Sequence, residues 1–235
     1  MTTLRTHGWR LLLLASGAFM MAGGPRHPEA DASHPLREEL ATMTAHPDWV
    51  PAHVLVLVST VLLALGLWGA RASGTWPSST RRSLTVGAIA VSVYVVEAAF
   101  HLAAVVDSHA LAHGGAAPVA FTHVGLSVVL YPVTGLAIAG LARSYGRALG
   151  GWRRLVAGVG VVAGLAQATS VPLSLVLPDV ELSPVFAAAG ILTAVWAIGT
   201  GAAGVRSRRT AAVDADAVAG ERREARATSP EQVLA

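Results

Sequence analysis

The chain contains no cysteine and no lysine among its 235 residues. Without cysteine it can form no disulfide, thiolate metal site, cysteine nucleophile or c-type haem attachment. Charged residues are also scarce, at 13% of the composition against about 25% in typical globular proteins, whereas apolar residues reach 53%. The P-loop, GxSxG, HExxH and GxGxxG motifs are missing as well. The composition is therefore that of a membrane protein, and no common catalytic signature assigns it an activity.

Six continuously apolar segments lie along the chain, and five of them have about 20 or more residues, enough to cross a bilayer core as a helix. Their apolar residues do not alternate with polar ones, which argues against membrane strands. We therefore expect an all-α integral membrane bundle of six transmembrane helices. The expected helices cover residues 9–24, 49–70, 84–106, 118–141, 155–178 and 184–205.

The first apolar segment is the shortest, with Arg5 before it and Arg10 at its start. We interpret residues 1–24 as an uncleaved transmembrane helix or signal anchor, because the small-x-small sequence at 30–32 lies far beyond the apolar run. The alternative is a cleaved signal peptide, which would leave five spans. The rest of the chain is expected to form an extracytoplasmic loop at 25–48, a five-helix transmembrane bundle at 49–205 and a cytoplasmic arginine-rich tail at 206–235.

The arginines predict the orientation of the chain. The N-terminus, the loops 71–83 and 142–154 and the tail hold 15 of the 17 arginines. The three remaining loops hold the other two arginines and eight of the 14 acids. Since basic residues concentrate on the cytoplasmic side, we predict a multi-pass protein of the cell membrane with both termini in the cytoplasm. Its partner is the lipid bilayer and not nucleic acid, because no recognition motif accompanies the arginines. The oligomeric state stays open.

All nine histidines lie at or before position 123, and eight of them fall on the predicted outer side. At about 1.5 Å of rise per residue, His53, His101 and His123 lie at a similar depth on three consecutive helices. Glu97 lies one helical turn from His101 on the same face. An ionisable residue within a membrane segment marks a candidate functional site. If the helices turn these faces inward, the three imidazoles can converge near the outer surface; the sequence leaves open whether the helix faces do so.

Neutral imidazole binds zinc, copper and iron, so His53, His101 and His123 are candidate ligands of a transition metal. Glu97 is a candidate fourth ligand, or the base that orients His101. Two facing histidines suit haem b instead. His109 and His113 lie four residues apart beyond the third helix and are candidate metal ligands at the entrance to the site.

Other polar residues of the outer side are expected to be solvated. They are His27 and His34, next to prolines in the outer loop, and Asp107, on the rim beyond the third helix. Gly160 and Gly164 form a GxxxG pattern, which close packing between helices explains without any function.

Two other functions are compatible with the same residues. The first is a proton-coupled small-solute transporter or pH sensor in which Glu97 and His101 titrate. The second is a structural or regulatory membrane subunit in which these residues only hydrogen-bond between helices. No nucleophile or substrate pocket can be identified, so the sequence leaves open whether the protein is an enzyme.

Three motifs carry a resemblance: HPDWVPAH at 46–53, EAAFH at 97–101 and FTHVGL at 121–126. They resemble small uncharacterised multi-pass membrane proteins of actinobacterial type, in which Trp-x-x-x-His, here Trp49 and His53, opens a helix. The resemblance covers about residues 30–145 and implies a membrane fold but no activity. EAAFH is also similar to the Glu-x-x-x-His element of haem A synthase-like proteins, although this chain lacks the second half of that pattern. Intramembrane zinc hydrolases of the ceramidase and progestin-receptor type need a later histidine pair, which is missing here.

Overall fold

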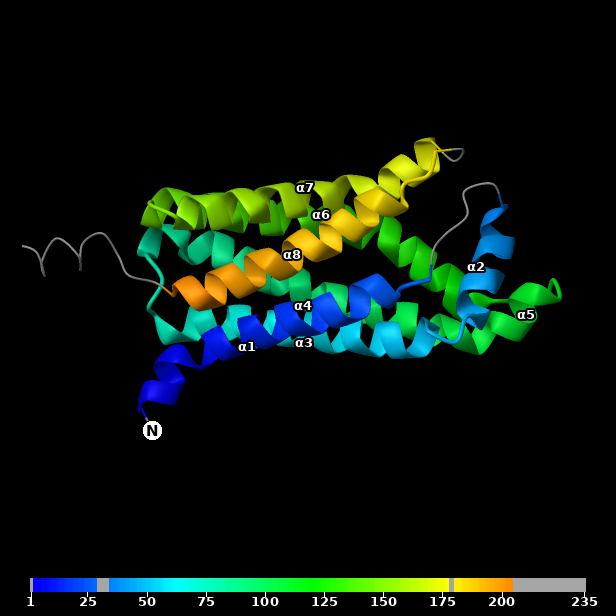
Figure 1. Ribbon diagram of the computed structural model, residues 1–235, viewed down its shortest axis with the longest axis horizontal. Helices are drawn as coiled ribbons and strands as arrows, with labels where there is room; N and C mark the ends of the chain where they lie inside the picture. The colour runs from blue at the N-terminus through cyan, green and yellow to red at the C-terminus, as the bar shows by residue number, and fades with distance from the viewer. Residues whose placement is uncertain (1, 29–33, 178–179, 205–235) are drawn as a thin grey trace, which may run out of the picture.

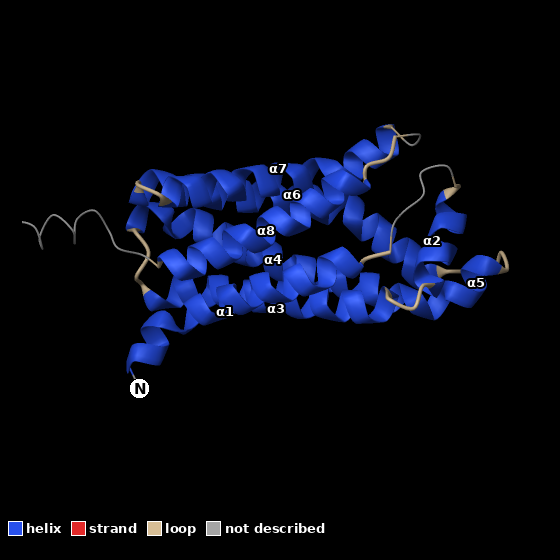
Figure 2. Cartoon of the chain, viewed as in Figure 1, coloured by secondary structure: helices blue, strands red, loops and turns tan. Residues whose placement is uncertain are grey.

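The computed structural model describes residues 2–28, 34–177 and 180–204 of the chain. Within these ranges the secondary structure consists of helices joined by short loops, without any strand (Figure 2). The α-helices and the 3-10 helices, labelled η, follow one another as α1 (Thr2–Gly23), η1 (Gly24–Arg26), α2 (Leu36–Ala45), α3 (Trp49–Ser73), η2 (Ser78–Thr80), α4 (Arg81–Ala103), η3 (Ala104–Asp107), α5 (Ser108–Ala112), α6 (Pro118–Leu149), α7 (Arg153–Val176) and α8 (Ser183–Ala203).

Five helical stretches of the described residues are long and apolar enough to cross a membrane, which confirms the all-α membrane bundle. They are Trp49–Ser73, Ser78–Ala112, Pro118–Leu149, Arg153–Val176 and Ser183–Ala203. The long helices lie lengthwise beside one another, and α2 and α5 extend the molecule at one end (Figure 1). The start of α3, the end of α4 and the start of α6 lie at the same end. We call it the histidine end.

The sixth expected helix is α1, which is not among the five long apolar stretches but packs beside α3 and α8. The hydroxyl of Ser59 on α3 donates to the carbonyl oxygen of Ser16 over 2.8 Å. On the α8 side, a Cβ added to Gly17 would lie 2.7 Å from the carbonyl oxygen of Ala194. Small residues therefore let α1 approach both neighbours closely. Whether the cell retains or cleaves α1 stays a prediction.

The opposite end of the bundle, the arginine-rich end, contains the start of α1, the loops 74–77 and 150–152 and the end of α8 (Figure 1). Two arginines cap α8 there. Arg10 donates from Nε to the carbonyl oxygen of Gly201 over 2.8 Å, and Arg153 donates from Nε to that of Gly204 over 3.3 Å. A cation at a helix C-terminus satisfies free carbonyls and complements the helix dipole. The predicted tail, 206–235, lies outside the described residues.

Glycines bring α6 and α7 into close backbone contact. A Cβ on Gly135 would collide with the backbone of Gly164, and the reverse also holds. Gly160, one turn away, similarly lies against the ring of Trp196 on α8. The prediction that the GxxxG pattern serves close packing is thus confirmed.

The histidine end is covered by a small apolar cluster. Helix α2, which the sequence did not predict within the loop 25–48, packs on α5 and η3. The apolar cluster consists of Leu40, Met43, Trp49, Ala104, Leu111, Ala117 and Ala120. This cluster closes the bundle above the predicted site.

Asp107 is buried, so its expected position on a solvated rim is wrong. Its Oδ2 accepts hydrogen bonds from the backbone N–H groups of Val119, at 2.7 Å, and Ala120, at 2.9 Å. These groups lie in the first turn of α6, where helical N–H groups have no partner within the helix. Asp107 therefore caps α6 although it lies 12 residues before Val119 in the sequence, and it fixes the turn that precedes His123.

Candidate metal centre

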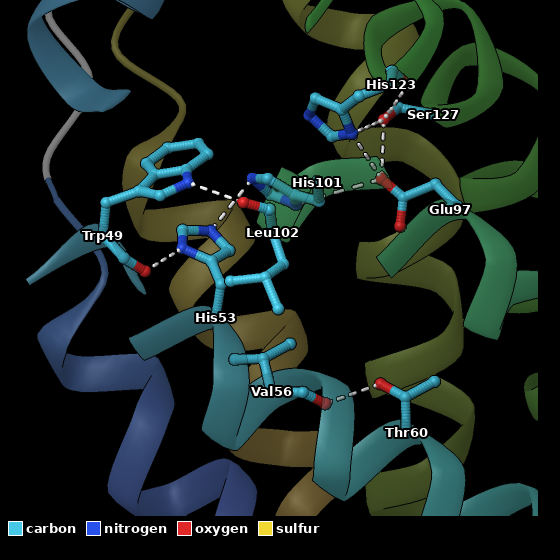
Figure 3. A network of polar contacts seen from close by, with 9 residues as sticks. All are labelled: Trp49, His53, Val56, Thr60, Glu97, His101, Leu102, His123 and Ser127. Atoms are coloured by element: carbon cyan, nitrogen blue, oxygen red, sulfur yellow. Dashed lines mark hydrogen bonds and ion pairs between the residues drawn. The ribbon is translucent and has the colours of Figure 1, made fainter. Parts of the chain in front are cut away.

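Helices α3, α4 and α6 bring the three predicted histidines together at the histidine end (Figure 3). His53 Nε2 on α3 and His101 Nε2 on α4 lie 3.0 Å apart. The rings of His101 and of His123, on α6, are stacked with centroids 3.9 Å apart. His101 is therefore the central ring of the cluster.

The backbone determines which nitrogen of His53 is free. Its Nδ1 lies 2.6 Å from the carbonyl oxygen of Trp49, one turn earlier on α3. A carbonyl oxygen only accepts, so Nδ1 carries the hydrogen and Nε2 of the neutral ring has a lone pair. The 3.0 Å contact is therefore a hydrogen bond in which His101 Nε2–H donates to that lone pair.

The indole ring of Trp49 covers one side of the histidine cluster. Its indole Nε1 donates to the carbonyl oxygen of Leu102 over 3.3 Å, which ties the start of α3 to the end of α4 (Figure 3). Its ring centroid lies 4.0 Å from that of His53 and 5.2 Å from that of His101. The indole is 1% exposed, so it shields both imidazoles on that side and keeps the Nε2 pair in a dry environment.

His27 also belongs to the cluster, so its expected exposure to solvent is wrong. Its ring centroid lies 4.7 Å from that of His53 and 5.6 Å from that of His101. Its Nδ1 donates to the carbonyl oxygen of Pro28 over 2.7 Å, which leaves Nε2 with a lone pair. Burial lowers the pKa of His27 below its usual value, so the ring is neutral at neutral pH and can bind a metal.

The sequence Gly23-Gly24-Pro25 explains how His27 reaches this position. Gly23 lies against α3, where an added Cβ would stand 2.9 Å from the carbonyl oxygen of Ala52. Gly24 and Pro25 begin the 3-10 turn η1, after which His27 follows. The depth argument that grouped the other histidines, extended to the first apolar segment and its glycine-proline stop, could have identified His27. The proline next to it led instead to the interpretation as a flexible loop.

Glu97 lies below His101 and is fully buried at 0% exposure. Its Oε1 accepts from His123 Nδ1 over 2.9 Å and lies 2.9 Å from the Ser127 hydroxyl. The same oxygen faces His101 Nδ1 at 3.9 Å. The other oxygen, Oε2, has no hydrogen-bond partner among the described residues. A buried carboxylate oxygen without a partner is costly and is typical of a functional site.

Two groups of side chains can each offer three ligand atoms within 4.8 Å of one another. The first consists of His27, His53 and His101, and the second of Glu97, His101 and His123. Two nitrogens bound to one tetrahedral ion at about 2.0–2.1 Å stand about 3.3 Å apart. The 3.0 Å between His53 and His101 Nε2 is close to that value. In the second group, His123 Nδ1 already lies 2.9 Å from Glu97 Oε1, and its ring is stacked on that of His101 with an interplanar angle of 21°, which is less suited to a shared ion.

His109 and His113, predicted at the entrance, belong to neither group. They are exposed on and after α5, with ring centroids 4.2 Å apart. His113 Nδ1 donates to the carbonyl oxygen of His109 over 2.8 Å. His34 is exposed as expected.

No protein-family model, curated protein or solved structure matches the chain. The resemblance to actinobacterial membrane proteins therefore stays a prediction.

Proposed function

We propose that this chain is a multi-pass membrane protein that binds one divalent transition-metal ion at its histidine end, through His27, His53 and His101. The observation that carries the proposal is the pair of Nε2 atoms 3.0 Å apart, at the spacing of two ligands of one ion. Three neutral histidines, without thiolates, suit zinc, copper(II) or iron(II). Such a ligand set leaves a fourth position for water or a substrate.

Glu97 completes the proposed site. To bind an ion through Nε2, His101 must carry its hydrogen on Nδ1, the nitrogen that faces Glu97 Oε1. A carboxylate there favours this tautomer and makes the imidazole a stronger ligand. The second contact of Glu97, to His123 Nδ1, holds the carboxylate in place from α6. Glu97 and His123 therefore support the ion without binding it.

Haem b is less compatible with this geometry. Two axial histidines of a haem face each other across the macrocycle, at roughly twice a metal–nitrogen bond of about 2 Å. Here the Nε2 atoms of His53 and His101 are already within hydrogen-bond distance. The rings of His101 and His123 are in stacking contact, so neither pair has room for a porphyrin between its rings.

We also propose that the histidine end lies outside the cytoplasm. The arginine-rich end carries the basic loops, and basic loops are retained in the cytoplasm. The ion would then be taken from the extracytoplasmic side, where α2 and α5 cover the site.

Metal analysis of the purified protein tests the proposal. The full chain, expressed without added metal and purified in detergent, is titrated with cobalt(II) as a spectroscopic substitute for zinc. We expect one ion per chain and the intense visible bands of a tetrahedral site. Elemental analysis of protein from zinc-, copper- or iron-supplemented cells then identifies the ion. A chain that takes up no ion in either experiment contradicts the proposal, and a Soret band would support haem instead.

Single variants distinguish the two ligand groups. His27→Ala should abolish cobalt binding, whereas His123→Ala should weaken it and keep the stoichiometry. The reverse result would support the ligand set predicted from sequence, in which His123 and Glu97 bind the ion. The double variant His109→Ala/His113→Ala is the matched control, since it removes two exposed imidazoles and should leave cobalt binding unchanged.

A further inference from the structure

An open depression of about 320 Å³ lies over the junction of α6 and α7 at the arginine-rich end. Arg143 and Arg147, one turn apart on α6, and Arg154, in the first turn of α7, line it. Its floor is made of small residues, including Gly146 and Gly158. We call this depression the arginine notch. It lies at the end of the bundle opposite the histidines, so nothing in its argument depends on metal binding.

Close helix packing forms the floor of the notch. A Cβ on Gly146 would stand 2.6 Å from the Cβ of Ala157, so α6 and α7 touch at this point. Gly158 has open space where its side chain would be. The helices are thus in contact below, and the three arginines line an uncovered hollow.

The charge of the notch is not neutralised within the described residues. Their acids are Glu38 and Glu39 on α2, Asp48 before α3, Glu97 in the last two turns of α4, Asp107 in η3 and Glu181 before α8; none of them lies in the helix ends that form the arginine-rich end. The neighbouring Arg153 differs, because it caps α8. All three notch arginines are exposed. Three cations with no carboxylate nearby in the described part of the chain favour an anion.

The surroundings of the notch indicate which anion. Val161 lines it one turn below Gly158, toward the middle of the bilayer. Next to Arg154, Trp152 is 52% exposed and Leu155 is 75% exposed. An outward tryptophan and leucine at this level are typical of the boundary between headgroups and acyl chains. A ligand in the notch therefore has a phosphate level with the arginines and an apolar surface beneath it.

We propose that the arginine notch binds the phosphate headgroup of an anionic phospholipid, with its acyl chains lying along α7 below Gly158. Arginine forms paired hydrogen bonds with phosphate oxygens, and basic pockets between transmembrane helices on the cytoplasmic side suit anionic headgroups.

Native mass spectrometry of the full chain tests this proposal, with phosphatidylglycerol and phosphatidylcholine as the probes. The wild type should retain about one phosphatidylglycerol in preference to phosphatidylcholine. The double variant Arg147→Gln/Arg154→Gln should lose roughly 30-fold in affinity for phosphatidylglycerol. The double variant Arg81→Gln/Arg82→Gln is the matched control, because it removes the same charge at the same end of the bundle, and its affinity should change less than threefold.

Three outcomes would overturn the proposal. Equal losses in both double variants would show that general positive charge attracts the lipid. Equal retention of the two lipids by the wild type would show no headgroup site. Displacement of the lipid by millimolar inorganic phosphate would assign the notch to a soluble anion. If the double variant does not fold in zwitterionic detergent, Arg154→Gln alone should still lose roughly fivefold, and an unchanged affinity would contradict the proposal.

Discussion

His101 connects the parts of the candidate metal centre, because its two ring nitrogens face different partners. Nε2 faces His53 at 3.0 Å, and Nδ1 faces Glu97 Oε1 at 3.9 Å. His53 has a single available tautomer, since its Nδ1 is bonded to a backbone carbonyl. The position of the hydrogen on His101 therefore decides whether the two Nε2 atoms form a hydrogen bond or are both free to bind the proposed ion.

Replacing Glu97 with glutamine tests this coupling at the residue scale. The amide has nearly the same size but lacks the charge that favours the metal-binding tautomer of His101. We expect Glu97→Gln to bind cobalt(II) with about 10–100-fold lower affinity and unchanged stoichiometry. Ser127→Ala, which removes a neutral contact of the same carboxylate oxygen, is the control and should have a smaller effect. Loss of the ion altogether would make Glu97 a ligand.

A second prediction concerns Asp107, whose carboxylate caps α6. Asp107→Ala leaves two N–H groups of the first turn without their partner, and we expect it to cost about 0.5–2 kcal/mol of stability. Asp107→Asn keeps an oxygen acceptor and should cost less. Thermal unfolding in detergent measures both. Equal stability of Asp107→Ala and the wild type would mean that water replaces the cap without cost.

At the scale of helices, glycines determine how closely the long elements approach. Gly135 on α6 and Gly164 on α7 bring two backbones into contact, while Gly23 brings the end of α1 against α3. The first contact fixes the α6–α7 pair, and the second carries His27 to the site. Cleavage at 30–32 would therefore remove a proposed ligand together with α1.

A pair of variants on α6 tests the α6–α7 contact. Gly135→Leu forces a side chain into the backbone of α7, and we expect a loss of stability of at least about 1–3 kcal/mol or failure to fold. Gly140→Leu is the matched control on the same helix, because nothing lies within 4 Å of a Cβ there. Size-exclusion chromatography and thermal unfolding should show a defect only in Gly135→Leu. Equal behaviour would mean that α7 can shift without cost.

At the scale of the whole molecule, the two ends of the bundle differ in charge. Arg10, Arg143, Arg147, Arg153 and Arg154 lie toward one end, and the histidine cluster lies at the other. The arginines divide between capping α8 and lining the arginine notch. This asymmetry is the physical basis for the proposed orientation, since translocating arginine across the bilayer is unfavourable.

The absence of native cysteine allows a direct test of the orientation. Ala116→Cys, an exposed position at the histidine end, should react with a membrane-impermeant maleimide in intact cells. Ser79→Cys, exposed at the arginine-rich end, should react only after the membrane is permeabilised. The cysteine-free wild type provides the background. The opposite labelling pattern would invert the proposed topology and place the metal site in the cytoplasm.

The sequence by itself determined the helical class, the five long apolar spans and the grouping of His53, His101 and His123 at one level. These features depend on local properties: the length of an apolar run, and the rise along a helix. Only the tertiary structure decided that His27 joins this cluster, that His123 stacks on His101 and contacts Glu97, and that Asp107 caps α6. Each of these features depends on how the helices turn and pack against one another. That packing is determined by backbone contacts between residues that are distant in the sequence.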